Sequence, residues 1–210
     1  MNKKQLIAFE AKVTKLWESG KIRVPVHLSG GNEDELIRIF RDIKRSDYVF
    51  STHRNHNHYL LHTGDTQGLY REILNLPGSI CKGASGSMHT CNHKSKFYSS
   101  GIVAGCVAIA CGVAKALQRD KSNRKVWCFI GDGCVDEGWF WEALRYAHGH
   151  ELPITYIIED NDRSVCTPKA TRWGKKDKMY QALSQFYPHV RSYFYTPKWP
   201  HVGTNHQIQW

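Results

Sequence analysis

Two apolar segments, each followed directly by polar residues, constrain the fold of this chain more than any other feature. Residues 126–130 (VWCFI) precede Gly131-Asp132-Gly133, and residues 154–158 (ITYII) precede Glu159-Asp160-Asn161. A helix-like stretch separates them, which gives the order strand, helix, strand. Such parallel strands end at one edge of an open sheet, where α/β folds bind ligands. We therefore predict an α/β fold, a doubly wound parallel sheet with helices on both faces, and a site at the ends of these strands.

The polar residues after the two strands have the chemistry of a magnesium site. Asp132 and Asn161 lie 29 residues apart and offer a carboxylate and a carboxamide oxygen. Mg²⁺ prefers such oxygen ligands, is held by few protein groups and keeps positions for phosphate and water. The pattern therefore predicts a Mg²⁺ site that also receives a phosphorylated ligand.

Composition limits the size of the fold and the kinds of partner. The 210 residues suffice for one α/β domain, which we expect over residues 1–187, with residues 188–210 as an extended C-terminal arm of the same domain. No apolar run is long enough for a membrane span, and the N-terminus lacks a secretory signal. The seven cysteines have no CxxC spacing, so we expect free thiols and a cytoplasmic protein. The net charge of +10 comes without a nucleic-acid-binding motif, so neither nucleic acid nor a membrane is an expected partner.

Hydrophobic periodicity and capping residues predict the remaining elements. Asn32 and Asp65 are expected N-caps, since their side chains accept hydrogen bonds from the first turn of a helix. Residues 78–101 are rich in Gly, Ser and Lys and are expected to be irregular. Helices are predicted over 3–18, 33–45, 66–75, 101–117, 136–149 and 175–187, and strands over 47–51, 126–130 and 154–159.

Four segments together carry a family resemblance. They are residues 47–56 (DYVFSTHRNH), 83–89 (GASGSMH), 97–104 (FYSSGIVA) and the segment 131–167 that holds Asp132 and Asn161. In this order and spacing they resemble the alpha subunit of the thiamine diphosphate (ThDP)-dependent 2-oxoacid dehydrogenase component, of the pyruvate, branched-chain and acetoin types. Transketolase is a more distant relative. The resemblance implies the diphosphate-binding domain of the ThDP superfamily, with ThDP and Mg²⁺ as cofactors.

The resemblance also assigns cofactor ligands. Asp132, Asn161 and the backbone carbonyl of Arg163 would hold Mg²⁺, and Arg54 would contact a phosphate in forked geometry. The free N–H groups at the start of the helix over 136–149 would face the diphosphate. Gly101 and Val103 would present backbone groups to the aminopyrimidine ring. The expected cofactor-binding set is His53, Arg54, Gly101, Val103, Gly131, Asp132, Gly133 and Asn161.

Several residues are candidates for a part in the reaction itself. His27 lies in the segment PVHLSGGNE, which resembles the family's HxxxGQEA segment, and its imidazole would stabilise an oxyanion or move a proton. His56 is a similar candidate, as is His89. Glu137, in GDGCVDEG, would lie near a subunit contact and link two active sites by proton transfer. The expected catalytic residues are thus His27, His56 and Glu137.

A ThDP enzyme also needs a glutamate at the aminopyrimidine, and by resemblance this residue belongs to a separate pyrimidine-binding domain. We therefore expect a beta-type partner subunit that supplies this glutamate, self-association to α2 or α2β2, and a small 2-oxoacid as substrate. The sequence does not contain the later His-bearing loop of larger relatives, which favours a compact two-subunit enzyme.

Other functions remain open at this point. A split transketolase-like enzyme would move a ketol group between sugars, and the sequence GDGC followed by Glu137-Gly138 favours it. An inactive subunit would bind ThDP or a partner without catalysis. A Zn²⁺ module would use His53, His56, His58 and His62, whose spacing places some of them on one helical face.

Overall fold

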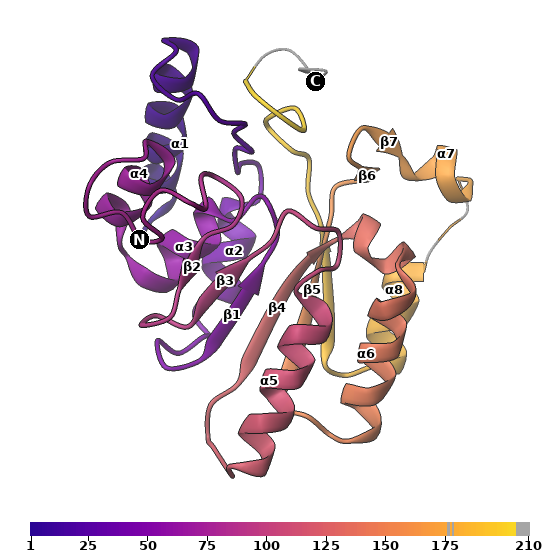
Figure 1. Ribbon diagram of the computed structural model, residues 1–210. Coiled ribbons are helices and arrows are strands. Elements are labelled where there is room, and N and C mark those ends of the chain that lie inside the picture. The colour runs from indigo at the N-terminus through magenta and orange to yellow at the C-terminus, as the bar shows by residue number, and fades with distance from the viewer. Residues whose placement is uncertain (176, 178, 205–210) are drawn as a thin grey trace. The chain divides into compact units, whose positions relative to one another are not determined.

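The computed structural model describes residues 1–175, 177 and 179–204. The chain forms two compact units (Figure 1). Unit 1 contains residues 1–46, residues 53–101 and the described residues from Thr196 onward, whereas unit 2 contains residues 47–52 and 102–195. Each unit is therefore built from segments that are distant in the sequence.

Unit 2 is built around a parallel sheet. Its strands lie in the order β1 (Tyr48–Ser51), β4 (Val126–Gly131), β5 (Ile154–Asp160) and β8 (Val190–Phe194). The residues of β4 and β5 are almost all buried, as expected for central strands of a covered parallel sheet. In the register of this pair, Gly131 lies opposite Glu159. The sheet therefore brings the two predicted polar ends to the same edge.

Three helices pack on this sheet. α5 (Val107–Arg119) contacts β4 and β5, α6 (Gly138–Gly149) runs beside α5, and α8 (Met179–Phe186) contacts β8 (Figure 1). Ala110 and Ala114 are fully buried on α5, where their small side chains allow close packing. The prediction of an α/β fold with a parallel sheet and packed helices is confirmed. α5 begins at residue 107 rather than 101, and residues 176 and 178 of the predicted helix over 175–187 lie outside the described residues.

Short elements follow β4 and β5 at the edge where ligands are expected. The 3-10 helix η1 (Asp132–Asp136) follows β4, whereas β6 (Arg163–Ser164), β7 (Thr167–Pro168) and α7 (Lys169–Trp173) follow β5. The sequence analysis does not predict them, because elements of two to five residues are too short to show a hydrophobic period. Since η1 includes residue 136, α6 begins two residues later than the predicted helix.

Unit 1 is mainly helical. Its elements are α1 (Lys3–Glu18), α2 (Glu33–Ile39), α3 (His56–Thr63), α4 (Thr66–Ile73) and a hairpin of β2 (Cys91–Asn92) with β3 (Phe97–Ser99). The Asp65 side chain accepts the Gly68 N–H at the start of α4, as predicted. Asn32 is the N-cap of α2 but makes no side-chain capping hydrogen bond, and α2 ends at residue 39 rather than 45.

The segment over 78–101 is ordered around one buried carboxylate. Glu72 on α4 has no exposed surface and accepts four hydrogen bonds of 2.7–3.2 Å, from the N–H groups of Cys81, Gly83 and Ser85 and from the Ser85 hydroxyl. Burial alone would raise the pKa of Glu72, but these donors bring it below its ordinary value of 4.5. The prediction of an irregular segment is right for most of its length, and the hairpin of β2 and β3 is the exception.

The end of the described chain packs on residues 26–31 of unit 1. Gly31 has a φ of +98°, and a Cβ at this position would lie 2.1 Å from the Thr196 carbonyl oxygen. Only glycine permits both this backbone conformation and this contact. Two backbone hydrogen bonds complete the contact, from Lys198 N–H to the Gly30 carbonyl and from Gly203 N–H to the Val26 carbonyl.

The predicted arm over 188–210 therefore has structure of its own. Within it, β8 pairs with β5 in unit 2, and residues 196–204 belong to unit 1. Residues 205–210 lie outside the described residues. The boundary between a domain over 1–187 and an arm over 188–210 stays a prediction.

Two predictions from composition can be compared with the structure. In the described part of the chain, no helix has both the length and the apolar character that crossing a bilayer requires. All seven cysteines are free thiols, as predicted.

Candidate functional site

A group of charged side chains in unit 2 surrounds the ends of β4 and β5. We call Asp132, Asp136, Asp160, Lys169 and Arg172 the carboxylate cluster. Arg172 Nη2 lies 3.1 Å from Asp132 Oδ2, and Arg172 Nη1 is paired with Asp136. Lys169 Nζ lies 2.7 Å from Asp160 Oδ2. Three carboxylates from two strand ends thus face two cations from α7.

Asp132 is the most buried member of the carboxylate cluster. It is 1% exposed, and its Oδ1 has no hydrogen-bond partner among the described residues. Burial and the nearby Asp160 carboxylate raise the pKa of Asp132 to about 7, although Arg172 and Lys169 oppose the shift. An additional cation would stabilise a buried carboxylate that has one open oxygen and an acidic neighbour. These residues therefore fit Mg²⁺, which takes carboxylate oxygens.

Both polar atoms of the Asn161 side-chain amide make hydrogen bonds. Its Oδ1 accepts the Arg163 N–H at 3.1 Å, and its Nδ2 donates to the Tyr195 hydroxyl at 3.3 Å. These contacts fix which end of the amide is the oxygen. Because a carboxamide oxygen has two lone pairs, Oδ1 keeps one for a metal ion.

The backbone of Arg163 fits the role that the resemblance gives it. In the β6–β7 hairpin, the carbonyl of Asp162, the residue before Arg163, accepts the Lys169 N–H. Arg163 itself lies opposite Pro168, which has no N–H to donate. Carbonyls alternate in direction along a strand, so the Arg163 carbonyl points away from β7. It is therefore not used by the hairpin.

The two glycines of the Gly131-Asp132-Gly133 segment differ in their surroundings. A Cβ at Gly133 would lie 2.6 Å from Ser164 Oγ and 2.9 Å from Ser164 Cβ. A Cβ at Gly131 would meet no atom within 4 Å. Gly133 thus allows η1 to approach β6, whereas Gly131 borders open space.

Glu137 is the N-cap residue of α6. Its backbone is extended, with φ −87° and ψ 132°, and its side chain makes no capping hydrogen bond. The free N–H groups of the first turn of α6 therefore follow directly after η1. A role of Glu137 in proton transfer between subunits stays a prediction.

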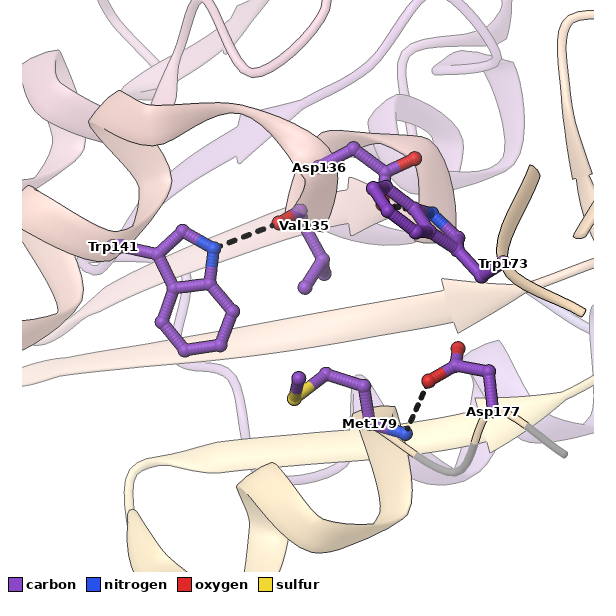
Figure 2. A pocket seen from close by; sticks show the side chains of 6 residues that line it. All are labelled: Val135, Asp136, Trp141, Trp173, Asp177 and Met179. Carbon is purple, nitrogen blue, oxygen red and sulfur yellow. Dashed lines mark hydrogen bonds between the residues drawn. The ribbon is translucent and has the colours of Figure 1, made fainter.

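A small cavity lies beside η1 (Figure 2). It measures about 200 Å³ and is lined by Val135, Asp136, Trp141, Trp173, Asp177 and Met179. Trp141 Nε1 donates to the Val135 carbonyl at 2.9 Å, and Trp173 Nε1 donates to Asp136 Oδ1 at 2.8 Å. Small-molecule pockets usually measure about 300–1,000 Å³, so this cavity is not a complete cofactor site. The hydrogen bonds of Trp141 and Trp173 instead hold η1 in place, together with Asp136, which is paired with Arg172.

Unit 1 places His27, His53 and His201 next to one another. The ring centroids are 4.9 Å apart for His27 and His53, and 5.1 Å apart for each of the other two pairs. Burial, followed by the nearby His201 and Arg54, lowers the pKa of His27 to about 3. Burial and Arg54 also hold the pKa of His53 well below 6.5. Both imidazoles are therefore neutral at physiological pH.

His56 lies in a buried chain of hydrogen bonds. Its Nδ1 is 3.1 Å from Glu10 Oε1, its Nε2 is 2.8 Å from Ser87 Oγ, and Ser87 Oγ accepts the His27 N–H at 3.3 Å. Since a carboxylate only accepts hydrogen bonds, Nδ1 carries a proton that it donates to Glu10. A catalytic role of His56 stays a prediction. Its contacts are those of a positioning residue for the His27 backbone.

Arg54 holds unit 1 together near these histidines. Its guanidinium donates to the backbone carbonyls of Leu28, Pro200 and His201 at 2.7, 3.0 and 3.4 Å. These bonds help to hold the C-terminal segment against residues 26–31. The expected contact of Arg54 with a phosphate stays a prediction, and it would require part of the guanidinium to turn away from these carbonyls.

Gly101 belongs to unit 1 and Val103 to unit 2. The Gly101 N–H donates to His89 Nδ1 at 3.4 Å, and a Cβ at Gly101 would lie 3.2 Å from His89 Nε2. Val103 is exposed, and the next residue, Ala104, has a φ of +52°, which is rare outside glycine. Backbone strain of this kind concentrates at functional sites. The contacts of Gly101 and Val103 with an aminopyrimidine stay predictions.

Lys169, Arg172 and His201 are candidate site residues that the motifs in the sequence do not identify. Lys169 and Arg172 are three residues apart on α7, and this spacing on one helical face was the available signal. His201 gave no signal, because its neighbours lie near the other end of the sequence. The proposed Zn²⁺ module of His53, His56, His58 and His62 does not form among the described residues, where His53 is grouped with His27 and His201 instead.

Comparisons with known proteins agree with the resemblance seen in the motifs. A family model described as "Dehydrogenase E1 component" matches residues 1–191. The chain is 33% identical over 165 residues to the alpha subunit of acetoin:2,6-dichlorophenolindophenol oxidoreductase of Bacillus subtilis (strain 168), covering 78% of this chain and 50% of that protein. It is 34% identical over 163 residues to the alpha subunit of the pyruvate dehydrogenase E1 component of Rickettsia prowazekii (strain Madrid E), covering 77% and 50%.

The chain therefore spans about half the length of the curated relatives that it matches. Among solved structures, a candidate thiamin diphosphate-dependent enzyme from Mycobacterium smegmatis matches with a TM-score of 0.43 and 18% identity. That match covers 67% of this chain and 22% of the other chain. The family assignment does not depend on it.

Proposed function

The chain belongs to the family of the dehydrogenase E1 component, and we propose that it is an alpha-type subunit of a ThDP-dependent enzyme that acts on a 2-oxoacid. The enzyme would decarboxylate this substrate and transfer or oxidise the acyl unit. The relative from Rickettsia prowazekii is an alpha subunit of a pyruvate enzyme, and pyruvate is a 2-oxoacid, which supports this proposal. The relative from Bacillus subtilis is named for acetoin, a hydroxyketone, and supports the alpha-subunit role only. The same matches do not favour the transketolase-like alternative.

One observation carries the cofactor part of the proposal, namely the open Oδ1 of buried Asp132 beside Asp160. We propose that Asp132, Asn161 and the Arg163 carbonyl hold Mg²⁺. The N–H groups at the start of α6 and the cations of α7 provide positive potential for a diphosphate. Arg172 is paired with both Asp132 and Asp136, and this pairing holds the Asp132 carboxylate in place.

ThDP, when bound, supplies a nucleophilic carbon and holds the electron pair that decarboxylation releases. The part of this chain in the reaction is assigned to His27. Because its imidazole is neutral, it can donate a hydrogen bond to a developing oxyanion or accept a proton without first losing one. The chain of Glu10, His56 and Ser87 would position the His27 backbone for this task. Glu137, at the start of α6, would transfer protons near a subunit contact.

A second chain completes the proposed enzyme. Relatives named as alpha subunits imply a beta partner and an oligomer. We propose that a pyrimidine-binding beta-type subunit supplies the activating glutamate, in an assembly of the α2β2 type. Cytoplasmic localisation is part of the same proposal.

Calorimetric titration of Mg²⁺ and ThDP tests the function. The chain is titrated alone and together with the protein encoded by the neighbouring open reading frame, and the mixture is assayed for CO₂ release from a panel of 2-oxoacids. We expect binding to appear or tighten in the mixture, together with CO₂ release. Asp132→Asn should weaken cofactor binding about 100-fold, since it removes the only anionic ligand that the protein is proposed to give the metal.

Asp120→Asn is the matched control, because Asp120 is an exposed residue at the end of α5 in the same unit. It should bind Mg²⁺ and ThDP like the unchanged protein. Equal binding by the Asp132 and Asp120 variants would refute the assigned metal site. Tight cofactor binding without CO₂ release from any 2-oxoacid would favour a subunit with another substrate.

A further inference from the structure

The three clustered histidines of unit 1 have a geometry that their expected roles do not explain. His27 comes from the segment before α2, His53 from the segment after β1, and His201 from the C-terminal segment. Each residue offers a ring nitrogen, and these three atoms all lie within 4.8 Å of one another. Within the described residues, no other group of histidine, cysteine and acidic side chains meets this condition.

Two of the ring nitrogens are buried without a partner. His27 Nδ1 and His53 Nε2 have almost no solvent-accessible surface and no hydrogen-bond partner among the described residues. A buried polar atom without a partner has lost its hydrogen bonds to water, so such atoms call for an explanation. Neutral imidazole nitrogens are good ligands for transition metals, and burial keeps the pKa values of all three rings low.

We propose that His27, His53 and His201 form a binding site for a divalent transition metal ion of the Zn²⁺ class. Three imidazole nitrogens with a fourth, open position are a common ligand set for Zn²⁺. Tetrahedral coordination at about 2.0–2.1 Å requires ligand nitrogens about 3.3 Å apart, so the rings must close by up to about 1.5 Å. Rotation of the side chains together with a small movement of the His201 segment can supply this.

The chemistry of the ligands separates this site from the proposed Mg²⁺ site. Mg²⁺ prefers oxygen ligands, whereas imidazole suits Zn²⁺, Cu²⁺ and Ni²⁺. Excess Mg²⁺ should therefore not displace Zn²⁺ from the histidines.

Arg54 limits the affinity of the site. Its guanidinium is bonded to the His201 carbonyl and its charge acts on all three rings. This charge opposes a second cation nearby. Its hydrogen bonds to the Pro200 and His201 carbonyls, however, also hold His201 close to His27. Arg54 therefore lowers the affinity for a cation through its charge but brings the histidine ligands together.

Metal binding here would have a consequence for the reaction. A metal ion on His27 would occupy the imidazole that we assign to oxyanion stabilisation and proton transfer, and would therefore inhibit the enzyme. This consequence depends on the proposed function, whereas the metal site does not.

The experiment uses the full chain, expressed without a histidine tag and stripped of metals. Co²⁺ is added as a spectroscopic probe, and Zn²⁺ is then titrated against a chromophoric chelator in the presence of excess Mg²⁺. We expect one Zn²⁺ per chain and the visible absorption bands of Co²⁺ with nitrogen ligands. His201→Gln should weaken Zn²⁺ binding at least tenfold, because even losses outside the ligand shell cost about 10- to 100-fold.

Two control variants make the result specific. His150→Gln changes an exposed histidine at the end of α6, and Asp132→Asn changes the proposed Mg²⁺ ligand. Both should bind Zn²⁺ like the unchanged protein, and circular dichroism confirms that each variant is folded. Absence of Zn²⁺ binding, unchanged binding in His201→Gln, or loss of binding in Asp132→Asn would each overturn the proposal.

Discussion

Glu72 in unit 1 and Asp132 in unit 2 are both buried carboxylates, but their surroundings move their pKa values in opposite directions. Glu72 is 0% exposed and accepts four hydrogen bonds from one loop, so its pKa is lowered. Asp132 is 1% exposed, and burial beside Asp160 raises its pKa to about 7. The charge of Glu72 is satisfied within unit 1, whereas Asp132 keeps one oxygen open.

This difference separates a structural carboxylate from a candidate ligand. Both groups bear the cost of removing a charge from water. For Glu72, backbone donors offset that cost and thereby fix the loop over 81–85. For Asp132, a cation has to offset it, and the Arg172 guanidinium lies 3.1 Å from its Oδ2. The comparison predicts that unit 2 responds to added Mg²⁺ and that the Glu72 region does not.

Arg172→Met should have the largest effect on stability among the variants that test the difference between Asp132 and Glu72. Removing the cation leaves Asp132 and Asp136 without their partner, and breaking a buried ion pair costs about 3–5 kcal/mol. Urea unfolding should show this loss without Mg²⁺ and partial recovery with Mg²⁺. Arg124→Met, at an exposed position, is the control and should unfold like the unchanged protein. Equal stability of both variants would mean that Arg172 does not balance the cluster.

Glu72→Gln should destabilise unit 1 by about 2–3 kcal/mol at neutral pH, because a charged acceptor of four hydrogen bonds is lost. The folded pKa of Glu72 lies below 4.5, so its stabilising effect is present above that pH and disappears as the pH falls through the folded pKa. The unfolding free energies of the variant and the unchanged protein should therefore converge in acid.

Chemical unfolding at neutral and acid pH measures this effect, with the exposed Glu142→Gln as control. Mg²⁺ should not restore the Glu72 variant, in contrast to Arg172→Met. A constant difference between variant and unchanged protein at all pH values would contradict the assignment of a charged Glu72.

Gly133→Ala tests how closely η1 must approach β6. The added Cβ would lie within 3 Å of Ser164, and such overpacking costs about 1–3 kcal/mol. Since Ser164 follows the proposed ligand Arg163, affinity for Mg²⁺ and ThDP should fall about tenfold for each 1.4 kcal/mol lost. Gly112→Ala, at an exposed position on α5, introduces a Cβ into open space and should have little effect in the same calorimetric titration. Unchanged cofactor affinity in Gly133→Ala would show that cofactor binding does not require the close packing of η1 on β6.

Tyr195→Phe should have the smallest effect. It removes the hydroxyl that accepts a hydrogen bond from Asn161 Nδ2, which is worth about 0.5–1.5 kcal/mol. Cofactor affinity measured by calorimetry should fall by about 2- to 12-fold. Tyr146→Phe, at an exposed position on α6, serves as the control. A larger loss than in Gly133→Ala would mean that the orientation of Asn161 matters more than the position of β6.

The sequence predicted the elements whose signals are local. The strands at 126–130 and 154–159 and the helix at 3–18 appear close to their expected bounds, because each depends on a period or an apolar run within one segment. The cap at Asp65 was predictable for the same reason. The parallel pairing of β4 with β5 follows from their order, and it brings Asp132 and Asn161 to one edge of the sheet.

Tertiary structure decided what surrounds those residues. The surroundings of the Asp132 carboxylate depend on where α7 lies. The sequence does not predict α7, because a helix of five residues is too short to show a hydrophobic period. The cluster of His27, His53 and His201 depends on the C-terminal segment lying along residues 26–31, where Gly31 leaves no room for a side chain. By itself, the sequence thus determined the central strands β1, β4 and β5 and the family. The burial of the site residues, their ion-pair and hydrogen-bond partners and their pKa values depend on contacts between segments far apart in the chain. Only the folded structure defines these contacts.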